Sequence, residues 1–172
     1  MGNKTEGRYS HVVHSFAPVY REDSEILILG SLPSVKSREQ GFYYGHPQNR
    51  FWRLLAELLG CGIPKTIAEK KDMMLSHGIA VYDVVLECDI IGSSDSSIKN
   101  VVPVNLKKML DGSRITRIYA NGRLAGKLYS CYLEPQTGIP ATVLPSTSPA
   151  NAAYNMERLK DAWRVIVSGV AE

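Results

Sequence analysis

The sequence lacks the features that would place a small protein in a specialised structural class. Its three cysteines, Cys61, Cys88 and Cys131, lie 27 and 43 residues apart. The chain therefore has neither the closely spaced pairs of a zinc knuckle nor the cysteine run of an iron–sulfur site. An odd number of widely spaced thiols favours a reduced intracellular protein, which we expect to be cytoplasmic. We expect no metal and no other cofactor.

Long apolar runs are also missing. No segment approaches the roughly 18 apolar residues of a membrane-spanning helix, and the N-terminal residues lack the apolar stretch of a secretory signal. We therefore expect no membrane association. Charge of one sign is not in excess either, because 20 Lys and Arg against 17 Asp and Glu leave a net charge of +3. That charge is too small to predict nucleic-acid binding on its own.

What is present is an ordinary globular composition. Of the 172 residues, 44% are hydrophobic and 22% are charged, which excludes wholesale disorder, collagen and coiled coil. A chain of this length can bury enough surface to fold without disulfides or a metal. We expect a single domain over residues 1–172, with residues 1–20 as an N-terminal extension.

Short apolar runs alternate with amphipathic segments along the chain. The apolar runs predict strands at residues 26–29, 79–86, 114–120 and 142–144. Apolar residues at intervals of three or four, with capping residues and glycines at the ends, predict helices at residues 49–59, 66–77, 104–110, 123–133 and 151–167. Residues 89–100 are rich in Ser and Asp and should form a loop. This alternation predicts an α/β fold, a three-layer sandwich around a central, mostly parallel four-stranded sheet.

In such sheets, ligands bind beyond the carboxyl ends of the strands. The loops after Leu29, Leu86, Ala120 and Leu144 are therefore the places to search. The first of them begins Gly30-Ser31-Leu32-Pro33-Ser34, which lacks the ending of a phosphate-binding P-loop and the three glycines of a dinucleotide fingerprint. A hydrolase with Ser31 or Ser34 as its nucleophile is disfavoured, because the Gly-x-Ser-x-Gly elbow is absent.

An aromatic-rich loop follows between Gly41 and Gly45. Its rings are Phe42, Tyr43 and Tyr44. Such rings can plug the core, or they can stack on a planar base, which is worth ~1–3 kcal/mol per base. The next helix starts with Phe51 and Trp52, which we expect to belong to the core.

Three segments together resemble the uracil-DNA glycosylase superfamily. They are Gly30-Ser31-Leu32-Pro33-Ser34, His46-Pro47-Gln48-Asn49-Arg50-Phe51-Trp52 and Leu144-Pro145-Ser146-Thr147-Ser148-Pro149-Ala150-Asn151. The first two are similar to the mismatch-specific uracil/thymine glycosylases, and the third to the hypoxanthine-DNA glycosylase branch. The resemblance implies a uracil-DNA-glycosylase-like fold. It also implies that the protein removes a deaminated base flipped out of double-stranded DNA. We expect the protein to be a monomer.

The resemblance assigns roles residue by residue, with two departures. Tyr44 lies where the family stacks an aromatic ring on the flipped base. Leu32 lies where most relatives carry an Asp or Asn that positions the water, and Ser146 lies where several carry a histidine that stabilises the leaving base. Because leucine cannot orient or deprotonate water, we predict that Asn49 is the catalytic residue. It would hold the water by accepting one hydrogen bond and donating another, although the same side chain can instead cap the helix.

The other predicted site residues form two groups. The base pocket is expected to comprise Gly30, Ser31, Leu32, Pro33, Tyr44, Gly45, His46 and Asp83. In it, His46 can protonate the leaving base or bond only to backbone, and Asp83 can read N–H groups of the base or pair with backbone donors. Paired glycosidase carboxylates at Asp83 and Asp95 stay open. Small residues near the start of the last helix and basic side chains are expected to contact the DNA backbone: Ser34, Lys36, Arg50, Ser146, Ser148, Pro149 and Asn151, with Arg38 and Arg123 as further candidates.

The predicted activity is hydrolysis of the N-glycosidic bond of a deaminated base, with hypoxanthine preferred, in base excision repair. One alternative is a uracil/thymine mismatch glycosylase. Another is a non-catalytic relative that binds damaged bases, because Leu32 removes the usual water-positioning group.

Overall fold

The computed structural model describes residues 7–168 and centres on a parallel four-stranded sheet. Its strands lie in the order β3 (Ile79–Asp83), β2 (Ile26–Gly30), β6 (Arg117–Asn121) and β7 (Ala141–Leu144). Strand β2 is buried along its whole length, as expected for a strand covered on both faces. Because successive side chains point to opposite faces, Ile26 and Ile28 join one core cluster while Leu27 and Leu29 join the other. The predicted three-layer α/β sandwich is confirmed.

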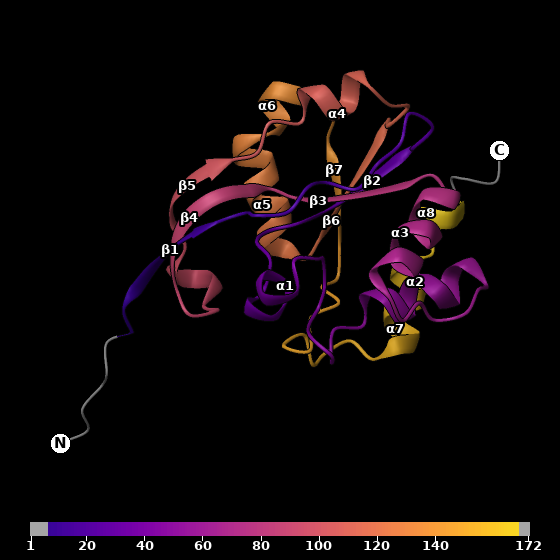
Figure 1. Cartoon of the computed structure of the whole chain (residues 1–172), viewed down its shortest axis with the longest axis horizontal. Helices are drawn as coiled ribbons and strands as arrows, with labels where there is room; N and C mark the ends of the chain where they lie inside the picture. The colour runs from indigo at the N-terminus through magenta and orange to yellow at the C-terminus, as the bar shows by residue number, and fades with distance from the viewer. Residues whose placement is uncertain (1–6, 169–172) are drawn as a thin grey trace.

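One face of the sheet is covered by α2 (Phe51–Leu59), α3 (Ile67–Ser76), α7 (Met156–Trp163) and α8 (Val165–Ser168). These helices gather on one side of the sheet in Figure 1. Trp163 of α7 is fully buried there, and its indole N–H donates to the carbonyl of Pro145 at 2.9 Å. This bond ties the closing helix to the loop that follows β7.

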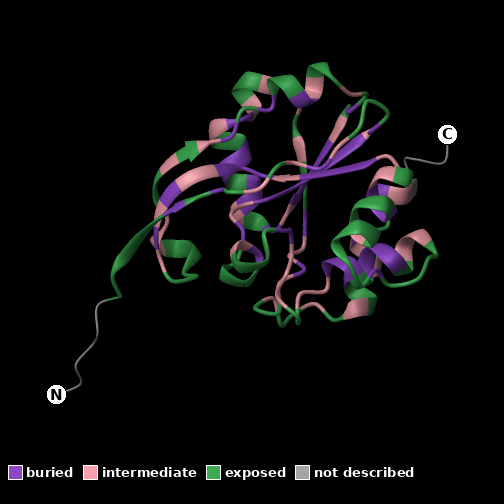
Figure 2. Cartoon of the chain, viewed as in Figure 1, coloured by how far each residue is buried: buried purple, intermediate pink, exposed green. Residues whose placement is uncertain are grey.

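The other face carries two kinds of element. The helices are α4 (Lys107–Asp111), α5 (Arg123–Tyr132) and α6 (Glu134–Thr137), and beside them lies a small antiparallel sheet of β1 (Tyr9–Val13), β4 (Val85–Ile91) and β5 (Lys99–Pro103), in the order β1-β4-β5. Figure 2 shows buried residues running along the central strands, while the outer helices are exposed on their far sides. None of the helices within the described range is long and apolar enough to span a membrane.

The antiparallel sheet is the part that the sequence patterns misassigned. The predicted strand at residues 79–86 divides at Val84 into β3 and β4, which belong to different sheets. The predicted loop at residues 89–100 was wrong, because β4 continues to Ile91, a 3₁₀ turn covers Asp95–Ser97 and β5 follows. Strand β1 pairs with β4, so the predicted N-terminal extension is part of the fold from residue 9 onward. Residues 1–6 of that extension lie outside the described range.

The helix predictions hold to within about three residues, with two exceptions. The predicted helix at residues 151–167 was wrong at its start. Helix α7 begins only at Met156, because Asn155 caps it by accepting the N–H of Arg158 at 2.9 Å. Residues 146–151 therefore form a loop and not the N-terminus of a helix. An unpredicted helix, α1 (Val35–Gln40), follows Ser34, which caps it by accepting the N–H of Ser37 at 3.1 Å.

Candidate active site

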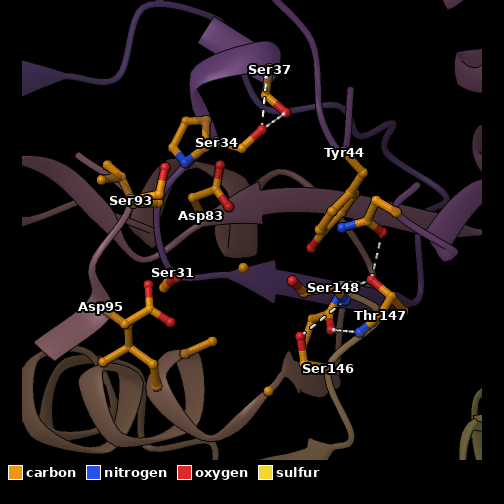
Figure 3. Close-up of a pocket in the computed structure, with 18 of the residues that line it drawn as sticks. Ser31, Ser34, Ser37, Tyr44, Asp83, Ser93, Asp95, Ser146, Thr147 and Ser148 are labelled. Carbon is orange, nitrogen blue, oxygen red and sulfur yellow. Dashed lines mark hydrogen bonds between the residues drawn. The ribbon is translucent and has the colours of Figure 1, made fainter. Parts of the chain in front are cut away.

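A cavity of about 340 Å³ opens at the carboxyl edge of the parallel sheet. The strand register explains which residues meet there. Gly30 at the end of β2 pairs with Asp83 at the end of β3, and Asn121 at the end of β6 pairs with Leu144 at the end of β7. Figure 3 shows Tyr44 and the loop residue Thr147 around the same space as Asp83. The cavity lies where the strand order predicts a ligand site.

Gly30 allows two polar groups to meet at the floor of the cavity. A Cβ atom at this position would lie 2.4 Å from Oδ1 of Asp83 and 3.1 Å from the hydroxyl oxygen of Tyr44. The first distance is far below a van der Waals contact, so any side chain here would displace the carboxylate. Glycine is therefore required for Asp83 and Tyr44 to face the same space.

Asp83 is buried and is held by a histidine from the N-terminal part of the chain. Nε2 of His14 lies 2.8 Å from Oδ2 of Asp83, and the imidazole packs between the rings of Phe16, Tyr43 and Tyr82. Burial raises the pKa of Asp83, while the hydrogen bond and the charge of His14 act in the opposite direction. Asp83 is thus paired with the His14 side chain and not with backbone donors, which was the alternative to reading the base. Its second oxygen, Oδ1, lies beside Gly30 at the cavity.

Tyr44 presents an aromatic ring to the cavity from a strained backbone. Its φ of 51° lies in the left-handed region, which is unfavourable for residues other than glycine. The ring stacks on Phe51, with centroids 4.0 Å apart. Burial raises the pKa of the Tyr44 hydroxyl and the nearby Asp83 charge raises it further, so the phenol is neutral at physiological pH. Phe42, by contrast, is buried against Trp52 and belongs to the core.

Asn49 lines the cavity two residues before helix α2 begins at Phe51. Its Oδ1 accepts the backbone N–H of Phe51 at 3.0 Å and the hydroxyl of Thr147 at 2.8 Å. The first bond satisfies a free N–H of the helix start, although the N-cap residue of α2 is Arg50 and not Asn49 as the capping alternative supposed. The two bonds together use both lone pairs of the oxygen. The predicted way of holding a water, in which this oxygen accepts a bond from it, therefore does not fit the structure.

Arg50 fixes the loop that follows β7. Its Nε donates to the carbonyl of Thr147 at 3.3 Å, and Nη2 donates to the carbonyls of Ser148 at 2.8 Å and Asn151 at 3.2 Å. Nη1 donates to the carbonyl of Tyr154. Four carbonyl groups engage the guanidinium, which leaves one of its five N–H donors for the phosphate contact that remains a prediction for Arg50. We call this arrangement the arginine clamp.

The comparison with known families shows to which family the chain belongs. The family model for the uracil DNA glycosylase superfamily matches residues 17–167, a range that contains all the segments around the cavity. The chain belongs to the uracil DNA glycosylase superfamily. The resemblance inferred from the three sequence segments is thereby confirmed.

The names and sequence identities of individual relatives support the assignment of this superfamily member. A protein of Methanosarcina acetivorans named hypoxanthine DNA glycosylase is 38% identical over 160 residues, which cover 90% of this chain and 98% of the relative. A Methanosarcina barkeri protein with the same name is 33% identical over 153 residues, covering 86% and 93%. A solution NMR structure of a Methanosarcina acetivorans protein, provisionally described as a uracil DNA glycosylase, has a TM-score of 0.78 at 32% identity and covers 91% of this chain and 97% of its own.

The cavity of this superfamily member brings together most of the predicted site residues: Gly30, Ser31, Leu32, Pro33, Ser34, Tyr44, Asn49, Asp83, Ser146 and Ser148. Leu32 contributes an apolar wall that also packs on the core. Other predicted residues lie outside the lining: Lys36, Gly45, His46, Arg50, Pro149 and Asn151. His46 is a backbone-bonded loop histidine, since its Nδ1 accepts the N–H of Gln48 at 3.1 Å. Lys36 is exposed and pairs with Glu39.

The residues that sequence reasoning missed include Thr147, Asn121 and His14. Thr147 lies between two predicted site residues, Ser146 and Ser148, and Asn121 follows the end of the third predicted strand. The position of each in the sequence could therefore have indicated a site residue. His14 had none, because it meets Asp83 across 69 positions of sequence. Within residues 7–168, no three His, Cys, Asp or Glu side chains are grouped as a metal site would require.

Proposed function

We propose that this chain is a monofunctional DNA glycosylase that hydrolyses the N-glycosidic bond of a deaminated base, with hypoxanthine preferred, in base excision repair. The observation that carries the proposal is the cavity in which the Asp83 carboxylate and the Tyr44 ring meet at Gly30. Its volume of about 340 Å³ is near the lower end of the range for ligand pockets, which suits a single base. The names of the two Methanosarcina relatives support hypoxanthine as that base.

The chemistry of the cavity suits hypoxanthine better than adenine. Deamination replaces the amino group of adenine by a carbonyl and places a proton on N1. Oδ1 of Asp83 can accept a hydrogen bond from this N1–H, whereas the N1 lone pair of adenine would be repelled by a carboxylate. The ring of Tyr44 provides a surface on which the flipped base can stack. Extrusion also costs least for a base that is mispaired.

The reaction replaces one bond to the sugar by another. A water oxygen bonds to C1′ of the deoxyribose as the bond from C1′ to N9 breaks. The electron pair of the broken bond goes to the base, which leaves as free hypoxanthine after gaining a proton, and the attacking water loses a proton to leave an abasic site. Because Leu32 is apolar and offers no group that orients water, we expect catalysis to depend mainly on easing the departure of the base.

Base release from defined duplexes tests the proposal. Duplexes carrying hypoxanthine, uracil, xanthine or a thymine mispair are incubated with excess enzyme, and abasic sites are detected as strand breaks after alkali. We expect the fastest release from hypoxanthine. Faster release from uracil or thymine would favour the mismatch glycosylase. Binding without any release would favour a non-catalytic relative.

Two variants connect that activity to the cavity. Asn49→Ala should lower the single-turnover rate by about 100-fold, the usual loss when one preorganised donor is removed. Gly30→Ala should abolish release, because its Cβ would overlap Oδ1 of Asp83. Gly62→Ala is the matched control, since no atom lies within 4 Å of its Cβ position. Normal release by Gly30→Ala would place the chemistry elsewhere.

The proposal includes a monomer that acts on double-stranded DNA in the cytoplasm. The three cysteines are free, which suits a reducing compartment. Sedimentation of the protein with and without a deoxyinosine duplex tests the oligomeric state.

A further inference from the structure

Three polar side chains form a chain of hydrogen bonds along the cavity wall, from the end of β6 to the start of α2. The backbone N–H of Thr147 donates to Oδ1 of Asn121 at 3.1 Å, and Nδ2 of Asn121 lies 3.0 Å from Oγ1 of Thr147. That hydroxyl lies 2.8 Å from Oδ1 of Asn49, which also accepts the N–H of Phe51 at 3.0 Å. Thr147 is fully buried, and its position on the wall is visible in Figure 3.

The backbone fixes the direction of every bond in this chain. A backbone N–H can only donate, so the atoms that face the N–H groups of Thr147 and Phe51 must be amide oxygens. Neither amide can be turned over without placing two donors against each other. Nδ2 of Asn121 therefore donates to the Thr147 hydroxyl. The hydroxyl has one proton, and this proton must go to Oδ1 of Asn49.

The amide nitrogen of Asn49 is the part that remains for a ligand. Nδ2 makes no hydrogen bond to any residue in the described range, and Asn49 lines the cavity. The Asn49 amide therefore presents a hydrogen-bond donor to the cavity. A donor cannot accept a proton from an attacking water, but it can stabilise the electron pair that a base carries away as its bond to C1′ breaks.

We propose that Thr147 is a positioning residue that locks the Asn49 amide with its N–H groups toward the substrate, so that Asn49 donates a hydrogen bond to the departing base. This inference rests on the proposed glycosylase activity. In the water-holding role, Oδ1 of Asn49 accepts a hydrogen bond from the water. In the role proposed here, Nδ2 contacts the substrate and Oδ1 only anchors the side chain. Asn121 supports the arrangement by setting the direction of the Thr147 hydroxyl.

Substitutions that exchange donors and acceptors test the inference in single-turnover release from a deoxyinosine duplex. Thr147→Val removes the hydroxyl at nearly constant volume and should lower the rate by about tenfold, the value of one hydrogen bond that orients a reacting group. Duplex affinity should be unchanged. Thr147→Ser restores the hydroxyl and should recover most of the rate. Asn49→Asp places an acceptor where the nitrogen lies and should be at least as inactive as Asn49→Ala.

A control variant exists on strand β7. Thr142→Val makes the same exchange at an exposed residue of β7 and should leave the rate unchanged. A Thr147→Val rate within threefold of wild type would overturn the inference. Equal losses in Thr147→Val and Thr147→Ser, or full activity of Asn49→Asp, would overturn it as well.

A readout that needs no catalysis separates this inference from the proposed function. In the free protein, an NMR scalar coupling across the hydrogen bond from the Phe51 amide nitrogen to Cγ of Asn49 should be present in the wild type. Its absence would show that the amide is not anchored as described and would overturn the inference whatever the activity. A wild type that shows the coupling but releases no base would instead count against the glycosylase proposal.

Discussion

At the scale of single residues, the carboxylate of Asp83 has the most unusual surroundings in the site. It is nearly fully buried, paired with a buried histidine and placed against a glycine. Burial raises its pKa above the usual value, with His14 acting in the opposite direction. A carboxyl group accepts an N–H of the base most strongly when it is ionised, because protonation removes the negative charge and turns one of the two oxygens into a donor.

The first prediction concerns the pH dependence of base release. As the pH falls through the raised pKa of Asp83, the carboxylate becomes protonated, so the single-turnover rate should decline at a pH above the ordinary range for aspartate. Asp83→Asn should be slower at neutral pH and should lack this acidic decline. Rate profiles from about pH 4 to pH 8 measure both effects. Asp111→Asn, at an exposed carboxylate on α4, should keep the wild-type profile, and an identical decline in Asp83→Asn would refute the assignment.

Residues that lie in recognisable segments could be predicted from the sequence. Asn49, Tyr44 and Gly30 were found because each belongs to a short motif whose spacing is informative. The role that we propose for Asn49 could not be predicted, because it depends on which end of the amide faces Thr147, almost a hundred positions away. For the same reason, no local pattern could reveal that His14 supports Asp83.

At the scale of elements, the arginine clamp joins the start of α2 to the loop after β7. The guanidinium of Arg50 reaches four carbonyl groups, so this one side chain holds the loop at four points. A lysine at this position keeps the charge but cannot present the planar fork of donors. The clamp is therefore sensitive to a substitution that is often regarded as conservative.

The second prediction follows from this geometry. Arg50→Lys should destabilise the protein by about 2–4 kcal/mol, because several carbonyl groups lose a charged donor. Thermal unfolding should show a clear drop in Tm. Arg53→Lys on the same helix, where the side chain is exposed beside Glu57, should change stability by less than about 0.5 kcal/mol. Equal Tm values for the two variants would argue against the clamp.

The third prediction concerns strand β1, which the sequence patterns assigned to an extension. Val12 is buried in the core cluster that contains Leu27 and Leu29, while its neighbour Val13 is 50% exposed. Val12→Ala should cost about 1–3 kcal/mol, and Val13→Ala should cost almost nothing. Denaturant unfolding of both variants measures the difference. A neutral Val12→Ala would mean that β1 does not contribute to the fold in solution.

Strands that are buried on both faces could be predicted from the sequence. The strands of the small antiparallel sheet and the start of the last helix could not. Strand β2 is a continuous apolar run, and its position was right to within one residue. Strands β4 and β5 mix apolar residues with Glu, Asp, Lys and Asn, and this polarity resembles that of a loop. The last helix was placed too early because Pro149 and Ser148 resemble a helix start, whereas the actual cap is Asn155.

At the scale of the whole molecule, the net charge of +3 indicates modest attraction to DNA, with few phosphate contacts. Arg123 is exposed at the first position of α5 and lines the cavity, so it is a candidate for one of these contacts. Lys127 lies one turn later on the same helix and lines a different depression. The two side chains therefore allow a matched comparison.

The fourth prediction is a change in salt dependence. The slope of log Kd against log salt for a deoxyinosine duplex should decrease in magnitude by about 0.9 in Arg123→Gln, the value expected for one lost phosphate contact. The slope of Lys127→Gln should equal that of the wild type. Fluorescence anisotropy at four or more salt concentrations measures both slopes. Unchanged binding by Arg123→Gln would move the DNA path away from α5.

The arginine clamp also bears on how an enzyme of this kind can survey a genome. Because the loop after β7 is already anchored in the free protein, this loop does not have to become ordered when the protein meets a duplex. Encounters with undamaged base pairs can then be brief, since neither arrival nor departure waits for a disorder-to-order transition. The time spent at each position is left to be set by how readily the nucleotide itself leaves the helix.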